Sequence, residues 1–343
     1  MTDAVARRRT RIRDVAEAAG VSVGTVSNAL NNPDMVAEGT RLRVEDAVRR
    51  LGFVRNASAR QLRAGRSSVV GAIVLDVGNP FFTEVARGIE DRLAEDNCVL
   101  MLCSSDERPD KELRYLRLLE EQGVRGMLVV PVQYDLDLLD KVRDRGTPVV
   151  LLDRTSARMD MCSVAVDDVN GGELAAGHLL EQGHRRLAFV NGSNNIRQCA
   201  DRRKGVDRAL RAAGLDAADS LLEVTVSTLN ADGGESALDQ ILRAPNPPRA
   251  IVCVNDLTAL GVLRGLRRRG LRAPEDVAVI GYDDVEFAAM LSTPLSSIRQ
   301  PKYQLGRTAA ELMLAEDGPD HVHQQILFQP ELVIRESSRT PAS

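Results

Sequence analysis

The order of apolar and polar positions at the start of the chain predicts two short helices joined by a tight turn. Apolar residues recur there at the i, i+3, i+4 and i+7 spacing of one helix face: Ile12, Val15, Ala16 and Ala19. Gly20 follows them and is free to adopt the left-handed conformation that ends a helix, and Ser22 then stands at the N-cap of a second helix. The apolar face of this second helix comprises Val26, Ala29 and Leu30. This spacing is typical of a helix-turn-helix.

From Ser68 onward, apolar segments of strand length alternate with helical segments such as residues 174–182 and 257–269. The apolar segments are VVGAIVLD from Val69, VLMLCS from Val99, GMLVVP from Gly126, PVVLLD from Pro148, SVAVD from Ser163, RLAFVN from Arg186, LLEVTV from Leu221, AIVCVN from Ala250 and VAVIGYDD from Val277. Because they are apolar on both faces and separated by helices, they predict parallel sheets covered on both sides. About ten strands are more than one such sheet usually holds, so we predict two α/β lobes.

Polar residues follow many of the predicted strands. They are Asp76 and Asn79, Asp153, Asp167 and Asp168, Asn191, Asn255 and Asp256, and Asp283 and Asp284. A single polar residue after a strand is most often the N-cap of the next helix. Open α/β sheets bind ligands where their strands end, so several such residues in one crevice predict a polar-ligand site. Arg202 would supply a cation there, and Phe81 or Phe82 a stacking surface.

The helix-turn-helix pattern predicts which side chains face DNA. The first residues of the second helix reach base edges in that geometry, with Val26 in the core. The expected exposed surface is Val23, Gly24, Thr25, Ser27 and Asn28. Asn28 can make paired hydrogen bonds to adenine, and Val23 can contact a thymine methyl group. The periodicity alone also fits an ordinary helical hairpin.

The distribution of charge favours the DNA-binding interpretation. Residues 1–66 hold 13 Lys and Arg against 7 Asp and Glu, whereas the remainder holds 32 against 42. A basic head on an acidic body fits a phosphate-binding module joined to a part that does not bind DNA. We expect the three arginines at positions 7–9 to form a solvated tail rather than a specific contact.

The composition, with 43% hydrophobic and 27% charged residues over 343 positions, is that of a globular protein of two or three domains. The chain has no apolar stretch of about 18 residues and no signal core, so we expect a cytoplasmic protein without membrane contact. The five cysteines form no C-x-x-C motif, which indicates buried, reduced thiols. Neither the pair His178 and His184 nor the pair His321 and His323 has a convincing metal partner in the sequence, so no metal or cofactor is expected.

Motifs of other function classes are missing from the sequence. It lacks G-x-x-x-x-G-K-[ST], G-x-G-x-x-G after a strand, G-x-S-x-G and H-E-x-x-H, which argues against an α/β enzyme acting on sugars or phosphates. An exported solute-binding protein would need a signal peptide, and the basic head argues against that class too.

The segments DVAEAAGVSVGTVSNALN and VAEGTRLRVEDAVRRLGFVRNASARQLRAGRS resemble the headpiece of LacI/GalR-family transcription regulators. Further landmarks follow in the family's order: NPFF at Asn79, VDDVNGG at Val166, RRKG at Arg202, VNDLTALG at Val254, VIGYDDVEF at Val279, TPLSSIRQP at Thr293 and FQPELVIRES at Phe328. The resemblance implies a DNA-binding headpiece at residues 1–55, a hinge at 56–66 and a two-lobed sensor like the periplasmic sugar-binding proteins. The first lobe would comprise residues 67–166 and 300–329, and the second residues 167–299 and 330–343.

The resemblance also implies functional residues. Asn56, Ala59, Gln61 and Leu62 match the family's hinge pattern, and a leucine at Leu62 would wedge between base steps in the minor groove. Phe81 and Phe82 would line an effector pocket. Asp153, Asn255 and Asp283 would hydrogen-bond ligand hydroxyls, and Arg202 would anchor the ligand.

The chain departs from the family pattern at several positions. Leu229 stands where sugar-binding members often have an aromatic residue, so ring stacking would fall to Phe81, Phe82, Tyr282 or Phe287. Arg11 and Ala37 stand where Ser or Thr commonly caps the first and third helices, which should weaken each helix start by about 1 kcal/mol. Thr10 offers a cap for the first helix one residue early.

The function implied is that of an allosteric repressor released from a pseudo-palindromic operator by a small sugar or sugar derivative. The alternative is a co-repressor-dependent regulator that binds a purine or nucleoside. We expect a homodimer, because no heptad repeat follows Arg335. The apolar face of residues 81–93, with Val85, Gly88 and Ile89, is either a dimer surface or core.

Overall fold

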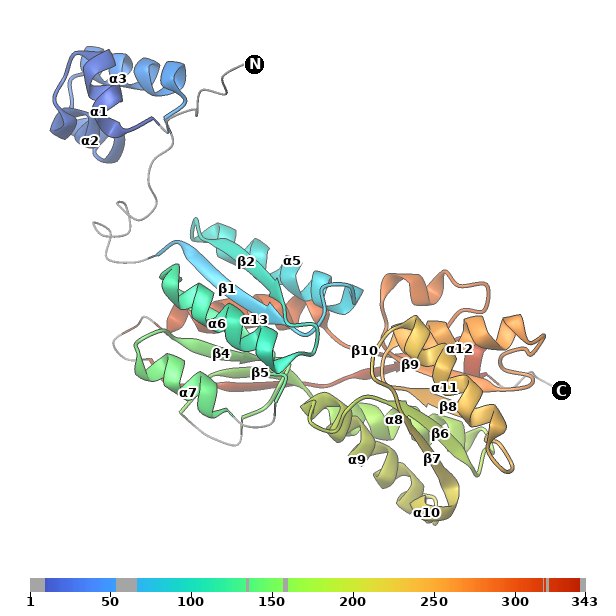
Figure 1. The fold of residues 1–343 in the computed structure, drawn as a ribbon. Helices are drawn as coiled ribbons and strands as arrows, with labels where there is room; N and C mark the ends of the chain where they lie inside the picture. Colours follow the sequence, from blue (N-terminus) through green and yellow to red (C-terminus); the bar gives the residue numbers. More distant parts are fainter. Residues whose placement is uncertain are drawn as a thin grey trace. The chain divides into compact units, whose positions relative to one another are not determined.

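The computed structural model describes residues 10–53, 67–133, 136–156, 160–316, 318 and 321–339. The chain divides into two compact units, Met1–Ser67, which we call the headpiece, and Ser68–Ser343, which we call the sensor (Figure 1). No helix among the described residues is both long enough and apolar enough to cross a membrane.

The headpiece is the predicted helix-turn-helix followed by a third helix. Its elements are α1 (Ile12–Ala19), α2 (Val23–Asn31), the short 3-10 helix η1 (Pro33–Met35) and α3 (Glu38–Leu51). Gly20, with φ of +64°, ends α1, and the Ser22 hydroxyl accepts a hydrogen bond from the Thr25 amide at 3.0 Å to begin α2. The buried core comprises Val15, Ala16, Ala19, Val26, Ala29, Val44 and Ala47.

The amino-terminal end of α1 is not capped in the way that the sequence predicts. The Thr10 hydroxyl donates to the carbonyl of Leu51 at the end of α3, at 3.0 Å, so the prediction that Thr10 caps α1 is wrong. The Asp14 carboxylate instead accepts the Arg11 amide at 2.7 Å. The Asp14 carboxylate in the first turn therefore provides part of the hydrogen bonding that a Ser or Thr cap would provide.

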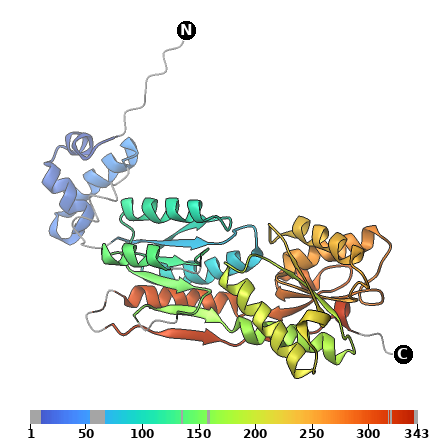
Figure 2. The same cartoon turned by 60° about the horizontal axis from the view of Figure 1, so that its bottom comes forward.

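Lobe 1 of the sensor is a six-stranded parallel sheet in the order β11-β5-β4-β3-β1-β2. The strands are β1 (Val69–Val74), β2 (Val99–Ser104), β3 (Gly126–Val129), β4 (Val149–Leu152), β5 (Ser163–Val166) and β11 (Gln325–Phe328). On β1, Val70 and Val74 pack toward α5 (Pro80–Glu95) and α13 (Lys302–Ala315), whereas Ile73 packs toward α6 (Pro109–Glu121) and α7 (Asp137–Asp144). Helices therefore cover both faces (Figure 2).

Lobe 2 repeats this layering with the order β12-β10-β9-β8-β6-β7, in which only β12 is antiparallel to its neighbour. The strands are β6 (Leu187–Asn191), β7 (Leu221–Thr225), β8 (Ala250–Cys253), β9 (Ala278–Asp283), β10 (Ser296–Arg299) and β12 (Glu331–Val333). The helices are α8 (Asp168–Glu181) and α9 (Arg197–Ala212) on one face, α11 (Ala231–Arg243) and α12 (Asp256–Arg268) on the other, and the short α10 (Ala217–Ser220), η2 (Glu286–Ala289) and η3 (Glu336–Ser338).

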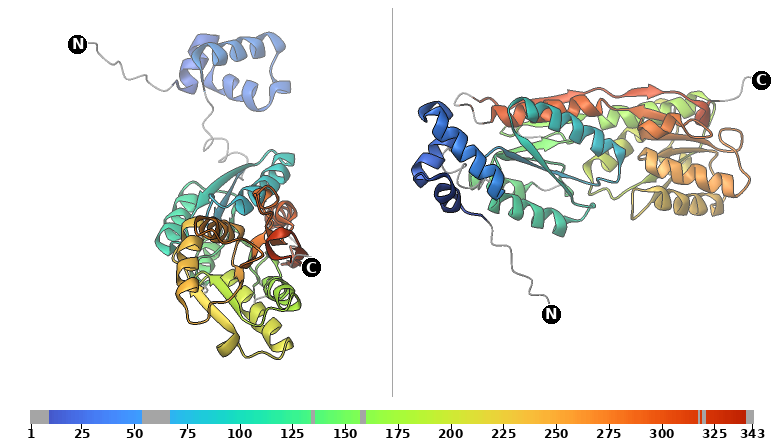
Figure 3. Two further views of the ribbon diagram at one scale, coloured as in Figure 1. Left: turned by 90° about the vertical axis from the view of Figure 1, so that its right-hand side faces the viewer. Right: turned by 90° about the horizontal axis from the view of Figure 1, so that it is seen from above.

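The chain passes between the two lobes three times: from β5 to α8, from β10 to α13 and from β11 to β12. Figure 3 shows the two lobes from two further directions. In each lobe the parallel strands point their carboxyl ends toward these crossings, so the loops that follow the strands meet between the lobes.

The apolar face of α5 lies in the core of lobe 1 and is not a dimer surface. Val85 and Ile89 are fully buried against α13. A Cβ at Gly88 would lie 2.1 Å from the Tyr303 carbonyl, so the two helices can cross this closely only because position 88 has no side chain. The core alternative for this face is therefore correct.

Candidate functional site

The amino-terminal part of α2 presents most of the residues predicted to read DNA. Val23 is 40% exposed, Gly24 and Asn28 are also exposed, and Thr25 is half-buried. Val26 is fully buried, as predicted. The hinge residues Asn56, Ala59, Gln61 and Leu62 lie outside the described residues.

Ser27 is buried, contrary to the expectation that it is exposed. It directly follows Val26 on α2 and therefore lies beside the core face, where its small side chain fits. The Asn31 amide group donates to the Ser27 carbonyl oxygen at 2.8 Å and lies 3.3 Å from its hydroxyl.

A cavity lies between the two lobes of the sensor. All six residues predicted to bind an effector line it: Phe81, Phe82, Asp153, Arg202, Asn255 and Asp283. Its other lining residues are Leu75, Asp76, Asn79, Glu107, Ile196, Gln198, Cys199, Leu229 and Val254. The cavity has a volume of about 40 Å³, which is room for a few water molecules. A sugar-sized ligand therefore requires the lobes to move apart.

A larger groove continues from this cavity toward solvent. It has a volume of about 520 Å³ and shares Asp76, Glu107, Ile196 and Leu229 with the cavity. Its walls come from both lobes, with Arg108 and Gln133 on one side and Asn195 and Asn230 on the other. The groove is thus the mouth of the cleft.

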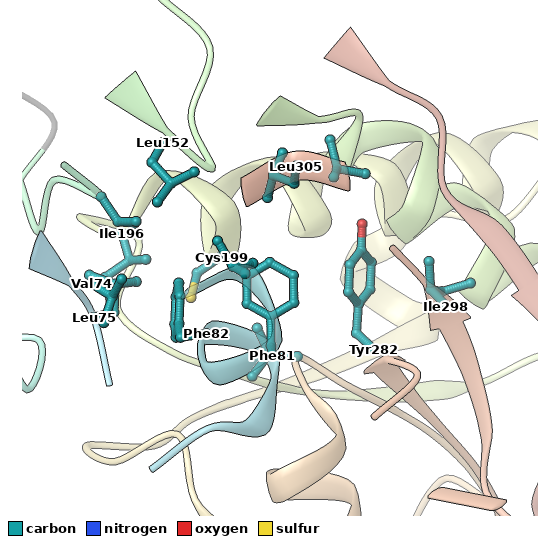
Figure 4. Packing of buried hydrophobic residues seen from close by; sticks show 14 of the residues in the cluster. Val74, Leu75, Phe81, Phe82, Leu152, Ile196, Cys199, Tyr282, Ile298 and Leu305 are labelled. Carbon is teal, nitrogen blue, oxygen red and sulfur yellow. The ribbon is translucent and has the colours of Figure 1, made fainter. Parts of the chain in front are cut away.

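Phe81 and Phe82 form the apolar wall of the cavity. They lie in the first turn of α5, with ring centroids 4.9 Å apart and planes at 79°. Figure 4 shows Phe82 beside Cys199 of α9, and Tyr282 on the other side of Phe81. Neither Tyr282 nor Phe287 is among the lining residues, so the stacking surface in this state comes from Phe81 and Phe82.

Arg202 is held firmly by its own lobe. Its Nε donates to Asp168 at 2.8 Å, its Nη1 donates to the Val254 carbonyl at 2.6 Å, and its guanidinium lies 3.6 Å from the centre of the Tyr282 ring. A Cβ at Gly171 would lie 2.1 Å from the Tyr282 hydroxyl, so this glycine leaves room for the stacked ring. Nη2 takes part in none of these contacts and is the guanidinium nitrogen left for a ligand.

Hydrogen bonds between lining residues of the two lobes cross the cavity, and Lys302 of α13 also donates to the Asp283 carbonyl of lobe 2 at 3.0 Å. Asn79 in lobe 1 donates to Asp283 in lobe 2 at 3.1 Å. Gln198 in lobe 2 donates to both the backbone oxygen and Oδ2 of Asp153 in lobe 1, at 2.6 and 2.9 Å. These bonds hold the cleft closed.

Asn255 acts mainly as a helix cap. Its Oδ1 accepts the Thr258 amide at 2.8 Å and its Nδ2 donates to the Leu229 carbonyl at 2.9 Å. The same side chain thus begins α12 and fixes the loop that carries Leu229 to the cavity.

Two buried oxygen atoms of the inter-lobe contact, Oδ1 of Asp153 and Oε1 of Gln198, have no hydrogen-bond partner among the residues that the structure describes. An unsatisfied buried polar atom costs about 1–3 kcal/mol, so both atoms are suited to a ligand that satisfies them. Asp153 also has a φ of +53°, an unfavourable conformation for an aspartate that holds its side chain at the end of β4.

The cavity carries an excess of acidic groups. Burial and the neighbouring Asp168 raise the pKa of Asp153 well above its usual range. Burial raises the pKa of Asp283 to about 6, although Arg202 opposes the shift. Burial and the nearby Asp76 raise the pKa of Glu107 to about 7. The site therefore resists further negative charge.

The sequence analysis missed several lining residues, among them Gln198, Ile196 and Glu107. Gln198 precedes Arg202 by one helical turn, so the i, i+4 spacing could have placed it on the same face of α9. Glu107 lies in a loop at φ of +58°, and no periodic pattern marks it.

Comparison with known proteins identifies relatives of both units. The family model for bacterial regulatory proteins of the lacI family matches residues 11–56, and the model for the periplasmic binding protein-like domain matches residues 176–338. The HTH-type transcriptional repressor PurR of Aliivibrio salmonicida is 34% identical to this chain, over 95% of this chain and 98% of its own length.

Solved structures share the fold of the sensor and of the whole chain. A LacI family transcriptional regulator from Enterococcus faecium with bound ribose has a TM-score of 0.72 and 30% identity, covering 79% of this chain and 98% of its own. The lac repressor dimer bound to operator and the anti-inducer ONPF has a TM-score of 0.82 and 25% identity, covering 97% of this chain and 100% of its own.

Proposed function

This chain belongs to the LacI family of bacterial regulatory proteins, and we propose that its effector is a small, uncharged sugar or sugar derivative. Its relatives make it a DNA-binding transcriptional repressor rather than an enzyme. The effector binds in the cavity between the lobes. Its binding lowers the affinity of a homodimer for a pseudo-palindromic operator.

The unpartnered oxygens of Asp153 and Gln198 are the observation that carries this proposal. A sugar hydroxyl both donates and accepts hydrogen bonds, so it can satisfy a buried carboxyl group in either protonation state as well as the amide oxygen. Phe81 and Phe82 offer an apolar face to the carbon side of a sugar ring. The relative from Enterococcus faecium, which has the same fold, holds ribose.

The charge of the cavity argues for an uncharged ligand. Asp153, Asp283 and Glu107 line the cavity, and Arg202, the cationic residue among its described lining residues, already makes an ion pair with Asp168. The raised pKa values of these three acids reflect an environment that disfavours negative charge, and a phosphate or carboxylate on the ligand would add such charge to a buried site, where it is poorly screened. Sugar phosphates and sugar acids are therefore disfavoured as effectors.

Linkage between the cleft and the operator follows from the inter-lobe hydrogen bonds. The ligand must displace or rearrange the contacts from Asn79 to Asp283 and from Gln198 to Asp153, because the closed cavity is too small for it. Binding thereby changes the angle between the lobes. A ligand that favours the lobe arrangement with weaker operator binding releases the DNA.

Operator reading is assigned to the first turns of α2 and to the hinge. Val23, Gly24, Thr25, Ser27 and Asn28 supply the major-groove surface, with Ser27 acting from the buried edge of the helix. Asn56, Ala59 and Leu62 supply the minor-groove contacts, with Leu62 as the wedge. The variant Leu62→Ala tests this assignment, because unchanged operator affinity and unchanged DNA bending would remove the wedge from the account.

The homodimer is supported by an apolar strand edge on lobe 1. Strand β2 is the last strand of its sheet, and its Val99, Met101 and Leu102 are exposed, as is Leu118 on the neighbouring α6. Such an edge is normally covered, and a second copy of the chain is the expected cover. Met101→Lys should give a monomer in sedimentation analysis, whereas Met290→Lys, at an exposed apolar position of lobe 2, should leave a dimer.

Calorimetry with the purified full-length chain tests the proposed effector class. The panel comprises neutral pentoses and hexoses, disaccharides such as cellobiose, the corresponding sugar phosphates, and purine nucleosides. We expect one neutral sugar to bind and its phosphate to bind at least a hundredfold more weakly. Tight binding of a sugar phosphate would contradict the charge argument, and tight binding of a nucleoside alone would establish the nucleoside-binding alternative.

A further inference from the structure

Four potential metal ligands converge at the amino-terminal edge of the lobe 1 sheet. Cys162 directly precedes β5, Glu316 follows α13, and His321 and His323 precede β11. Their ligand atoms all lie within 4.8 Å of one another. The sequence analysis assigned no metal partner to the two histidines, and the fold supplies two from distant segments.

The parallel pairing of β5 with β11 brings these residues together. Ser163 is in register with Gln325, so the residues just before the two strands lie side by side. Cys162 is fully buried, the side chains of His321 and Glu316 are each 10% exposed, and that of His323 is 29% exposed. The cluster is thus mostly shielded from water but has an entry path along His323.

Four of the six distances between the ligand atoms are close to those around a tetrahedral zinc ion, and the other two are below 4.8 Å. With Zn–N and Zn–O near 2.1 Å and Zn–S near 2.3 Å, ligand atoms should be separated by about 3.4 Å for N and O pairs and about 3.6 Å for S and N pairs. Glu316 Oε1 lies 3.3 Å from His321 Nε2 and 3.4 Å from His323 Nδ1. Cys162 Sγ lies 3.2 and 3.7 Å from the same two nitrogens.

Hydrogen bonds alone account poorly for this arrangement. Each imidazole nitrogen faces both the sulfur and the carboxylate oxygen, although one ring nitrogen carries either a single proton or a single lone pair. Glu316 Oε1 is buried and has no hydrogen bond of acceptable geometry despite its two close nitrogens. A metal ion between the four mutually close ligand atoms would satisfy all of them at once.

The surroundings also resemble those of a metal-bound thiolate. The Gln324 amide donates to Cys162 Sγ at 3.4 Å, a contact that stabilises a thiolate and orients it. The two imidazole rings are edge-to-face, with centroids 5.0 Å apart at 78°, so both can direct a nitrogen to the same point without clashing.

We propose that Cys162, Glu316, His321 and His323 form a zinc site that fastens the end of α13 and the segment before β11 to the start of β5. One sulfur, two imidazole nitrogens and one carboxylate oxygen in tetrahedral geometry suit Zn²⁺, whereas Mg²⁺ and Ca²⁺ prefer all-oxygen sites. All four positions are filled by protein side chains, so the site is structural. The zinc site lies at the amino-terminal ends of the lobe 1 strands, whereas Asp153 follows the carboxyl end of β4.

Metal analysis of the tag-free full-length chain tests this proposal. Chelator-treated protein is reloaded with zinc sulfate or cobalt chloride, dialysed and measured by mass spectrometry and visible absorption. We expect one zinc per chain, a Co²⁺ spectrum with the intense bands of tetrahedral coordination and a sulfur-to-cobalt charge-transfer band, and a melting temperature raised by about 5 °C on zinc loading.

Matched variants separate this site from others on the chain. Cys162→Ser should abolish the sulfur-to-cobalt band, and His321→Gln or His323→Gln should reduce zinc to well below one per chain. Cys103→Ser and His184→Gln, which lie elsewhere in the sensor, should retain full loading. If Cys162→Ser fails to fold, the cobalt spectrum of the wild type still tests sulfur ligation, and the zinc content of the two histidine variants still tests the site. Substoichiometric zinc in the wild type, a cobalt spectrum without sulfur ligation, or unchanged loading in the histidine variants would each overturn the proposal.

Discussion

Gln198 of lobe 2 donates two hydrogen bonds to Asp153 of lobe 1, one to its backbone oxygen at 2.6 Å and one to its carboxylate at 2.9 Å. Within the described part of the chain, each residue keeps one buried oxygen without a hydrogen-bond partner. The contact therefore closes the cleft and leaves polar groups unsatisfied where a ligand would lie. A closed but incompletely satisfied contact is suited to a switch, since a ligand that supplies the missing hydrogen bonds shifts the balance between lobe arrangements.

Removing the Gln198 amide should weaken effector binding. We expect Gln198→Leu, which keeps the length of the side chain, to lower the affinity for the sugar selected by calorimetry at least tenfold. The reason is that the variant loses a hydrogen bond to the ligand and leaves a buried ligand hydroxyl without a partner, which costs about 1–3 kcal/mol. The matched control is Gln304→Leu, since the Gln304 amide donates to Thr308 within its own helix. Equal affinity in Gln198→Leu and Gln304→Leu would count against this role.

The pH dependence of stability should reveal the partly buried acid Glu107. The pKa of Glu107 is raised in the folded state to about 7 from an ordinary value of 4.5, so the folded state binds this proton more tightly than the unfolded state does. Its contribution to stability is complete below pH 4.5 and is lost as the pH rises to 7.

Glu107→Gln should remove this loss. At pH 7 the variant should be more stable than the wild type by on the order of 2 kcal/mol, and the difference should vanish toward pH 4. Denaturant unfolding between pH 4 and 8 measures it, with Glu181→Gln, an exposed acid at the end of α8, as the control. A wild-type and variant pair with parallel pH profiles would show that Glu107 is not perturbed.

The start of α1 should depend on Asp14. Asp14→Ala removes the acceptor of the Arg11 amide and should destabilise the first helix by about 1 kcal/mol, which corresponds to roughly fivefold faster amide hydrogen exchange in α1. Glu17→Ala makes the same charge change at an exposed position of the same helix and should have little effect. The idea fails if both variants exchange alike.

Asn28 should carry sequence-specific operator affinity. It is exposed on α2 and can pair with a base, so Asn28→Ala should cost about 1–3 kcal/mol, or roughly fivefold to 150-fold in affinity, for the selected operator. The slope of the logarithm of operator affinity against the logarithm of salt concentration should stay the same, because no phosphate contact is lost. Asn32→Ala, just beyond the helix, provides the control, and a variant with a changed salt slope and intact specificity would contradict base reading.

The sequence predicts those parts of the molecule that depend on local periodicity and on strand polarity. The apolar spacing of residues 12–30 is enough to place α1, the turn and α2, because each helix buries one stripe of small apolar residues. Parallel strands bring their carboxyl ends to one crevice, so residues such as Asp153 and Asp283 can be assigned to one site although they are far apart in the chain.

Periodicity and strand polarity do not predict features that depend on the rotation of a helix about its axis or on contacts between distant segments. Ser27 is polar yet buried, because it is small and borders the core face of α2. Gln198 reaches Asp153 only because α9 turns that face toward the other lobe. Cys162 and His323 are separated by 161 positions and meet through the pairing of β5 with β11, which no local pattern reveals.

Operator binding of the full-length chain, measured with and without the neutral sugar selected by calorimetry, tests the central claim most directly. The DNA is a fragment recovered by selecting genomic fragments bound by the protein, and fluorescence anisotropy reports affinity for the wild type, for Asp153→Asn and for the exposed control Asp219→Asn. We predict that the sugar lowers operator affinity at least tenfold in the wild type and in Asp219→Asn, and much less in Asp153→Asn, whose affinity without sugar is unchanged. An equal response in all three proteins would place the effector outside the inter-lobe cavity and contradict the account.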